Sequence, residues 1–326
     1  MPTNRKKVLV PNTMGKEGVA LLTARDDIEV QAFPSAIVQA DLLPLLGDVA
    51  GIALGVTPYR QTELDASPHM EVVARIGVGY DAVEVPALTA RKVPLMVAGT
   101  SNSISVAEHA LYLMMTLAKR GQALDRKVRD GKWRDRNDGL PAELAGKTVL
   151  IVGFGRIGTR SARRCAGLEM NVLVYDPYVP AATIRAAGWE KVDDLEAALP
   201  RADFVTIHCP KTPETVGMFN AARLGRMKRG AAIVNTARGG IIDEPALHEA
   251  LTTGHLSGAG LDVFEAEPTP VSNTLLKLDN VIASPHMAGV TTESVAGMGR
   301  VTAENILSVL DGKPNRDNVI NKEVLD

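Results

Sequence analysis

The sequence predicts an α/β protein with two doubly wound lobes, each built on a parallel sheet. Short runs rich in valine and isoleucine alternate with amphipathic helical stretches along most of the 326 residues. In such a rhythm each helix carries the chain back to begin the next parallel strand. The apolar residues of the runs are consecutive rather than alternating, which is typical of strands buried on both faces. A chain of this length has room for about two domains.

The first lobe is predicted from five apolar runs in the N-terminal third of the chain. Amphipathic stretches such as Leu42–Leu46 separate the runs and are expected to be helical. The predicted strands are Val8–Val10, Ile28–Val30, Gly51–Leu54, Val72–Ile76 and Leu95–Val97.

A helix is predicted over Ser105–Lys119, between the two series of strands. Ser105 and Glu108 have the spacing of a capping box, in which the serine hydroxyl and the glutamate carboxylate bind backbone N–H groups reciprocally. We expect Gly121 to end this helix. A long helix at this place would form a hinge between the two lobes.

The second lobe is predicted from six further runs. A last helical pattern, Thr291–Leu310, follows them and ends near Gly312 and Pro314. The chain therefore has about eleven predicted strands, divided five and six. The strands of the second series are Thr148–Val152, Asn171–Tyr175, Phe204–His208, Ala231–Asn235, Ala259–Val263 and Val281–Ala283.

Composition excludes several classes of function. Apolar residues make up 45% and charged residues 23% of the chain, and 36 basic against 38 acidic residues give a net charge of −2. A nucleic-acid-binding protein normally carries a concentrated positive charge, so we expect no nucleic-acid partner. The apolar stretch Ala110–Ala118 is too short to cross a bilayer, and no signal core follows the N-terminus. Cys165 and Cys209 form no CxxC pair, so we expect a cytoplasmic protein without disulfides.

A glycine-rich turn directly follows the first strand of the second series. It reads GFGRIG over residues 153–158, and a helical pattern over residues 159–166 comes next. In this spacing Gly153 permits the tight turn, Gly155 has no Cβ to obstruct a pyrophosphate, and Gly158 lets helix and strand pack closely. The helix N-terminus offers unpaired N–H groups to the anion. The turn predicts a dinucleotide-binding site.

An acidic residue in the expected place supports that prediction. Asp176 ends the next strand, eighteen residues after Gly158, where its carboxylate can accept hydrogen bonds from a ribose diol. The same carboxylate would repel a 2′-phosphate, and Pro177 and Tyr178 supply no arginine to neutralise one. The sequence therefore favours NAD over NADP.

Three segments at strand ends carry side chains suited to hydride transfer between a hydroxy acid and an oxo acid. Arg238 has a planar fork that matches a carboxylate. His286 can give and take a proton near neutral pH. Glu267 can stabilise the imidazolium form of that histidine and fix its ring. Taken singly, Arg238 can also form an ion pair on the surface, and His286 can also be an ordinary polar surface residue. Asp262 and Glu265 with these residues lack the spacing of a metal motif, so we expect no metal.

The motifs together resemble those of a known family. They are RIGVGYD (75–81), SVAEH (105–109), GFGRIG (153–158), HCPKTPET (208–215), NTARGG (235–240), LDVFEAEP (261–268) and SPHMAG (284–289). In this order the sequence resembles the D-isomer-specific 2-hydroxyacid dehydrogenases along nearly its whole length. Within the family it looks like members of the phosphoglycerate dehydrogenase and hydroxypyruvate reductase type.

The resemblance implies roles for particular residues. Arg238, Glu267 and His286 would be catalytic, Arg238 would also hold the substrate carboxylate, and no acid role falls on His109. Substrate contacts are implied at the main-chain N–H groups of Val78 and Gly79, and Arg60 is the basic candidate in the loop before them. NAD contacts are implied at Gly153, Gly155, Arg156, Ile157, Gly158, Asp176, Pro210, Thr236, Ala237, Asp262 and Gly289.

The resemblance also implies a domain plan. A Rossmann cofactor domain, residues 104–285, would be inserted into a flavodoxin-like substrate domain made of residues 1–103 and 286–326. We expect a homodimer built through the cofactor domain. The chain ends forty residues after His286, so we expect a short form without a C-terminal regulatory domain.

The substrate stays open at this point. The loop around Arg60 lacks the arginine-serine-arginine pattern of typical phosphoglycerate dehydrogenases, yet Arg60 favours a substrate with an anionic tail. The candidate pairs of 2-hydroxy and 2-oxo acids are those of 3-phosphoglycerate, hydroxypyruvate, glyoxylate and lactate. An NAD-sensing transcriptional corepressor of the same fold is the alternative, and the complete arginine, glutamate and histidine set favours an enzyme.

Overall fold

The computed structural model describes residues 5–135 and 139–326. The chain forms two compact units: unit 1 is Met1–Asn102 with Val290–Asp326, and unit 2 is Ser103–Gly289. The second boundary lies after Gly289 and not before His286, because residues 286–289 are tied to the end of a strand of unit 2, as described below. Residues 1–4 of the expected substrate domain lie outside the described residues.

Unit 1 contains a five-stranded parallel sheet in the order β2-β1-β3-β4-β5. This is the flavodoxin-like order of a doubly wound sheet. The central strand β3 is buried along its whole length, as its run of small and branched apolar residues predicts. The strands are β1 (Lys6–Pro11), β2 (Ile28–Phe33), β3 (Val49–Leu54), β4 (Val72–Arg75) and β5 (Leu95–Met96).

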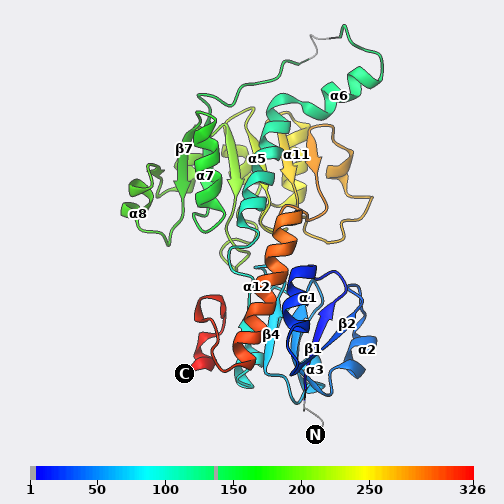
Figure 1. Cartoon of the computed structure of the whole chain (residues 1–326). Coiled ribbons are helices and arrows are strands. Elements are labelled where there is room, and N and C mark those ends of the chain that lie inside the picture. Colours follow the sequence, from blue (N-terminus) through cyan, green and yellow to red (C-terminus); the bar gives the residue numbers. More distant parts are fainter. Residues whose placement is uncertain (1–4, 136–138) are drawn as a thin grey trace. The chain divides into compact units, whose positions relative to one another are not determined.

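Helices of unit 1 join regions that are far apart in the sequence. Helices α1 and α12 lie side by side (Figure 1) because glycines let their backbones approach. A Cβ on Gly18 would stand 2.1 Å from the carbonyl oxygen of Gly299. The helices are α1 (Lys16–Thr23), α2 (Gln39–Leu42), α3 (Gln61–Asp65), α4 (Val85–Ala90) and α12 (Thr292–Leu310), with 3₁₀ turns Leu43–Leu45, Arg316–Asn318 and Lys322–Leu325.

Unit 2 contains a seven-stranded parallel sheet in the order β12-β11-β10-β9-β6-β7-β8. The strand order reverses between β6 and β9, which is the switch point at which doubly wound sheets bind dinucleotides. The strands are β6 (Thr148–Val152), β7 (Asn171–Tyr175), β8 (Glu190–Lys191), β9 (Phe204–Ile207), β10 (Ala232–Asn235), β11 (Gly258–Leu261) and β12 (Val281–Ala283).

Helices cover both faces of this sheet, and each face has its own apolar core. On one face α5 packs against β11, where a Cβ on Gly260 would stand 2.9 Å from the Cβ of Leu113. The helices are α5 (Ser103–Lys119), α6 (Gly121–Arg129), α7 (Gly158–Gly167), α8 (Ala181–Ala186), α9 (Leu195–Ala198), α10 (Ala221–Arg226) and α11 (Glu244–Thr252), with 3₁₀ turns Leu199–Arg201 and Thr274–Lys277.

Helix α5 ends at Lys119, as the sequence predicts, but its start and the role of Gly121 differ from the prediction. The helix begins at Ser103, so Ser105 lies inside it and the expected capping box is wrong. Glu108 instead forms an ion pair with Arg164 of α7, with 2.9 Å between Oε1 and Nη2. At the other end Arg120 adopts the left-handed conformation, with φ of 53°, and Gly121 starts α6 rather than ending α5. No helix of the described ranges is both long and apolar enough to cross a bilayer.

Candidate active site

The three segments that carry Arg238, Glu267 and His286 follow neighbouring strands of unit 2. They leave β10, β11 and β12, which are adjacent and parallel. Since parallel strands end at the same edge of a sheet, all three segments lie at the carboxyl edge. The backbones of the three loops lie against one another, as the sequence predicts, and among the three side chains Glu267 and His286 are in contact.

The loop after β10 is held in shape by Asn235, whose side chain is buried. Its Nδ2 donates to the carbonyl oxygen of Arg238 at 2.9 Å, and its Oδ1 accepts from the N–H of Ala237 at 3.0 Å. A Cβ on Gly239 would stand 1.7 Å from the carbonyl oxygen of Phe264, so only glycine fits there. The arginine loop is thereby packed directly on the loop that leads to Glu267.

Glu267 and His286 are in contact. The Oε2 atom of Glu267 lies 2.6 Å from Nδ1 of His286, and Oε1 accepts from the N–H of Phe264 at 3.0 Å. The side chains are 34% and 48% exposed, so the pair is reachable from solvent. With one ring nitrogen bound to the carboxylate, Nε2 is left to face a reactant.

The backbone of His286 is itself unusual. Its φ is 56°, the left-handed region, which non-glycine residues adopt at a cost of about 1–2 kcal/mol. Its N–H donates to the carbonyl oxygen of Asp262 at 2.8 Å, and the Asp262 carboxylate accepts from the N–H groups of Met287 and Ala288 at 2.9 and 2.8 Å. Strain of this kind is typical of functional sites whose surroundings fix the conformation.

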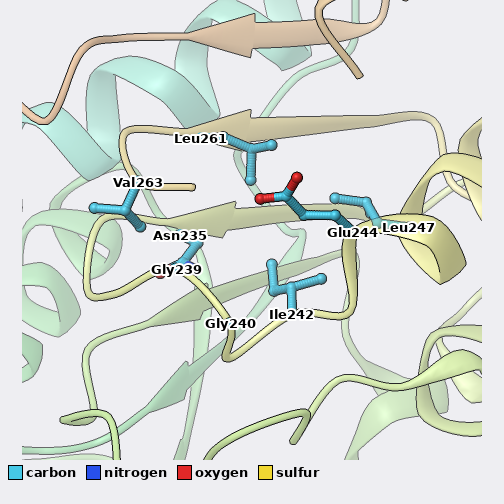
Figure 2. A pocket seen from close by; sticks show the side chains of 8 residues that line it. All are labelled: Asn235, Gly239, Gly240, Ile242, Glu244, Leu247, Leu261 and Val263. Carbon is cyan, nitrogen blue, oxygen red and sulfur yellow. The ribbon is translucent and has the colours of Figure 1, made fainter. Parts of the chain in front are cut away.

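Glu244 holds the loop that carries Glu267 by hydrogen bonds, and the sequence prediction did not include this residue. Its Oε1 accepts from the N–H of Glu265 at 2.6 Å, and its Oε2 accepts from Nδ2 of Asn273 at 2.9 Å. Figure 2 shows its carboxylate pointing into a pocket of about 10 Å³, which holds no more than a water molecule. The pocket is lined by Asn235, Gly239, Gly240, Ile242, Glu244, Leu247, Leu261 and Val263.

The glycine-rich turn has the geometry that the sequence predicts. Gly153 has φ of 94°, and a Cβ there would stand 2.7 Å from the N atom of Cys209. A Cβ on Gly158 would stand 2.0 Å from the carbonyl oxygen of Gly153. At Gly155, by contrast, a Cβ would meet open space, and Gly155 and Arg156 are exposed. The turn therefore leaves room above the N-terminus of α7 for a pyrophosphate.

Asp176 lies beside this turn. Its Oδ2 accepts from the N–H of Phe154 at 2.8 Å, and its Oδ1 accepts from Tyr178 and Val179 at 2.9 and 3.1 Å. The carboxylate is half-buried at the end of β7, the strand next to β6. Oδ1 therefore uses both of its lone pairs, and Oδ2 has one left with which to accept a ribose hydroxyl.

The buried hydroxyl of Thr236 is suited to contact the nicotinamide end of a dinucleotide. Thr236, after β10, is 7% exposed, and its Oγ1 has no hydrogen-bond partner among the described residues. Buried hydroxyls are usually paired, so this one is suited to a bound group. Ala237 is half-buried beside it, and Pro210, after β9, is exposed. The open glycine turn and the unpaired hydroxyl both fit a dinucleotide laid along the carboxyl edge.

His208 directly follows β9, and one of its ring nitrogens is buried without a hydrogen-bond partner among the described residues. Its Nε2 lies 3.1 Å from Oγ1 of Thr206, whereas Nδ1 has no partner within the described chain. Burial lowers the pKa of His208 to about 3. The folded protein thus keeps this imidazole neutral, while the unfolded chain takes up a proton near pH 6.5.

The stability of the protein should fall in mild acid because of His208. Its contribution is complete above about pH 6.5 and is lost as the pH falls towards 3, at up to about 1.4 kcal/mol per pH unit. Urea unfolding between about pH 8 and 5 measures this effect. The free energy of unfolding should fall less steeply in His208→Gln than in the unaltered protein. Equal slopes would contradict the buried neutral imidazole.

Apart from Arg238, the expected substrate contacts belong to unit 1. Arg75 shapes their loop: its Nε donates to the carbonyl oxygen of Gly79 at 2.8 Å, and its Nη1 donates to that of Leu54 at 2.9 Å. Val78 and Gly79 are half-buried, and Arg60 is exposed at the start of α3. The loop follows β4 and Arg60 follows β3, so they share one edge of the unit 1 sheet.

A larger hollow lies in unit 1, and none of the site residues predicted from the sequence lines it. It has a volume of about 740 Å³ and lies at the N-termini of α1 and α12, lined by Gly15, Lys16, Glu17, Thr291 and neighbouring residues. Elsewhere, no group of three or more histidine, cysteine or acidic residues in the described ranges has the geometry of a metal site.

Comparison with known proteins decides the family. A model of the D-isomer specific 2-hydroxyacid dehydrogenase NAD binding domain matches residues 111–288, more than half of the chain. The chain belongs to the D-isomer specific 2-hydroxyacid dehydrogenase family. Its unit 2 is the NAD-binding domain of that family, in agreement with the two parallel sheets and the open glycine turn.

Individual dehydrogenases of the family agree in sequence and fold. The chain is 41% identical to a D-3-phosphoglycerate dehydrogenase of Archaeoglobus fulgidus over 264 residues, 79% of this chain and 50% of the relative. It thus spans about half the length of the curated relatives it matches. A solved protein of Thermus thermophilus has 32% identity and a TM-score of 0.87, covering 96% of this chain and 99% of that one. A D-lactate dehydrogenase of Aquifex aeolicus, solved with NAD and lactic acid, has 27% identity and a TM-score of 0.84, covering 96% and 99%.

Proposed function

We propose that the protein is an NAD-dependent oxidoreductase that interconverts a D-2-hydroxy acid and a 2-oxo acid. The contact of 2.6 Å between Glu267 and His286 carries this proposal. The two residues lie at the carboxyl edge of the NAD-binding domain, with Glu267 in the loop beside the one that carries Arg238, and this position supports a role in proton transfer. Nicotinamide, when bound, supplies or accepts the hydride at C2 of the acid.

The three side chains have separate tasks. Arg238 binds the substrate carboxylate through its planar fork. In the direction of reduction His286 donates a proton from Nε2 to the ketone oxygen, and in oxidation it takes the proton of the hydroxyl group. Glu267, bound to Nδ1, stabilises the imidazolium and holds the ring in one orientation.

The cofactor contacts proposed in unit 2 follow the carboxyl edge. Main-chain N–H groups of Arg156 and Ile157 bind the pyrophosphate, and Asp176 binds the adenosine ribose. Asp262, which is 1% exposed, is also a proposed cofactor contact, and its carboxylate accepts hydrogen bonds from the loop that carries His286. The remaining proposed contacts are Gly153, Gly155, Gly158, Pro210, Thr236, Ala237 and Gly289.

For unit 1 we propose a role in substrate binding. Main-chain N–H groups of Val78 and Gly79 are the proposed ligands of the carboxylate, in a loop that Arg75 fixes. Arg60 is the proposed partner of an anionic tail. The relatives named as D-3-phosphoglycerate dehydrogenases support a phosphorylated substrate of that kind.

Loss of NADH absorbance with a panel of 2-oxo acids tests the function. The panel is 3-phosphohydroxypyruvate, hydroxypyruvate, glyoxylate and pyruvate. At least one of them should be reduced, and the preferred one identifies the substrate. Binding of NADH without turnover of any of the four would contradict the enzyme and favour an NAD-sensing protein.

Asp176→Ala should weaken the preference for NADH over NADPH. The carboxylate accepts hydrogen bonds from the ribose diol and repels a 2′-phosphate, so its loss should raise KM for NADH and lower KM for NADPH. A hydrogen bond to a charged group contributes roughly 1.5–3 kcal/mol, which predicts a change of at least tenfold in the ratio of kcat/KM values. Steady-state rates with both cofactors measure it. An unaltered ratio would remove the assignment of Asp176.

We also propose a homodimer formed through unit 2. Helix α6 stands apart from the sheet (Figure 1) and exposes Leu124 and Val128, four residues apart, at 40% and 54%. Trp133 follows at 64% exposure. Exposed apolar side chains gathered in this way typify association surfaces. Sedimentation equilibrium should give about twice the 34.7 kDa mass of the chain, and the monomer mass would contradict the proposal.

A further inference from the structure

We infer that His109 and Ser284 are positioning residues that hold the His286 loop in its active conformation by fixing the carboxylate of Asp262. The inference rests on the proposed function, because it concerns the placement of the proposed proton donor. Neither residue belongs to the proposed catalytic or cofactor-binding set. Both lie in unit 2, His109 on α5 and Ser284 directly after β12.

The three side chains form a continuous chain of hydrogen bonds. Nε2 of His109 lies 2.8 Å from Oγ of Ser284, and that Oγ lies 2.5 Å from Oδ1 of Asp262. The distance from Nε2 to Oδ1 is 3.8 Å, so the serine hydroxyl stands between histidine and aspartate. This order differs from that of a nucleophilic triad, in which the histidine lies between the serine and the acid.

The direction of each bond follows from the chemistry of the groups. An ionised carboxylate can only accept, so Ser284 donates its hydroxyl hydrogen to Asp262. Ser284 then has no hydrogen left for His109 and accepts from it. His109 must therefore carry a hydrogen on Nε2. The histidine acts as a donor that orients the serine hydroxyl towards the aspartate.

Asp262 transmits this constraint to the reactive loop. The side chain is 1% exposed, and its two oxygens accept three hydrogen bonds: from Ser284, from the N–H of Met287 and from the N–H of Ala288. The carbonyl oxygen of the same residue accepts from the N–H of His286. A buried carboxylate that loses one of these donors keeps an unsatisfied charge, and its bonds to the loop amides should loosen.

The left-handed backbone of His286 makes this support necessary. A conformation that costs about 1–2 kcal/mol persists only where neighbouring contacts impose it. The Glu267 contact holds the ring of His286, and the Asp262 bonds hold the backbone on both sides of the same residue. His109 lies on α5 and so connects this support to that helix. Its ring also packs against the ring of Tyr112, with 5.5 Å between the ring centroids.

The test compares removal of each polar group with its conservative replacement. Ser284→Ala removes the hydroxyl and Ser284→Thr retains it. His109→Phe keeps a ring but removes the donor, whereas His109→Gln restores an N–H donor at a similar distance from the backbone. Ser257→Ala is the matched control, because Ser257 stands at the opposite end of β11 from Asp262 and donates to the carbonyl oxygen of Ala231 at 3.2 Å.

Two readouts are measured on every variant. The first is the split between kcat, KM for the 2-oxo acid and the dissociation constant for NADH. We expect Ser284→Ala and His109→Phe to lower kcat by about tenfold to a hundredfold, the effect of misplacing a reacting group by about 1 Å. KM for the 2-oxo acid should change by less than about threefold, because Arg238 lies on another loop. The dissociation constant for NADH should change by a smaller factor than kcat, because the proposed contacts at the glycine turn and Asp176 remain in place while only those at Asp262 and Gly289 are disturbed. The threonine and glutamine variants should recover most of the lost kcat.

The second readout is hydrogen exchange of the backbone amides of Met287 and Ala288. Their N–H groups donate to Asp262, so they should exchange faster in Ser284→Ala and His109→Phe and remain slow in the threonine and control variants. Unchanged kcat and unchanged exchange in Ser284→Ala would overturn the inference, as would an equal loss of kcat in Ser257→Ala. If the unaltered protein reduces no 2-oxo acid, the proposed function fails, and the exchange rates alone then support or overturn the positioning of the loop.

Discussion

His286→Ala is expected to lower kcat for reduction of the 2-oxo acid by about 10²–10⁴-fold, while the protein still binds NADH. General acid catalysis contributes an acceleration of this size, and the alanine variant has no group to protonate the ketone oxygen. Stopped-flow and steady-state loss of NADH absorbance measure the rate, and fluorescence titration measures cofactor binding. The side chain of His286 is about half exposed and lies outside the apolar core, so its removal leaves no cavity in the core.

The backbone of His286 calls for a second variant as a control. Asparagine tolerates the left-handed region better than other side chains, so His286→Asn keeps the loop conformation without the proton donor. Both variants should be equally slow. His248→Ala, on α11, removes a histidine that lies outside the proposed site and should leave kcat unchanged. Turnover of the asparagine variant within about tenfold of the unaltered protein would exclude His286 as the acid.

Arg238→Lys is expected to lower kcat/KM by about tenfold to a hundredfold, mainly through a higher KM. The ammonium group preserves the positive charge, so the loss reports the planar fork alone. One hydrogen bond between charged groups contributes roughly 1.5–3 kcal/mol, which corresponds to this range. Initial rates over a range of 2-oxo acid concentrations, at saturating NADH, separate the two constants.

The matching control for Arg238→Lys is an arginine of the same unit, unit 2. Arg229→Lys changes an exposed arginine before β10 and should leave both constants unaltered. If Arg238→Lys behaves like Arg229→Lys, the fork does not bind the carboxylate. A fall in kcat with an unchanged KM would instead mean that the guanidinium acts only in the transition state.

Much of the fold could be predicted from local sequence. The bounds of β6, β7 and β12 agree with the prediction, because each is a run of apolar residues with clear polar ends. Strand β8 could not be found: it has two residues, Glu190 and Lys191, both charged, and exists only because β7 lies beside it. The sequence prediction starts α5 two residues too late, because Ser105 and Glu108 have the spacing of a capping box although both lie inside the helix. Glu108 faces Arg164 on α7, which no local pattern shows.

The site was predictable where its chemistry lies in short motifs. Arg238, Glu267 and His286 each lie in the loop that follows a strand, so the parallel sheet brings their loops to one edge. The residues that hold these side chains in place cannot be identified from short motifs. Glu244 looks like an ordinary helix start, and His109 is 175 positions away from Ser284 along the chain. Contacts at such separations arise only when the sheet and α5 pack together.

Transfer of deuterium from labelled cofactor tests the central claim most directly. NADH carrying one deuterium at C4 is prepared as its two isomers, and each is incubated with the protein and the preferred 2-oxo acid. We expect one isomer, and only one, to deliver its deuterium to C2 of the product, which has the D configuration. Product without deuterium from either isomer, or product of the L configuration, would contradict that claim.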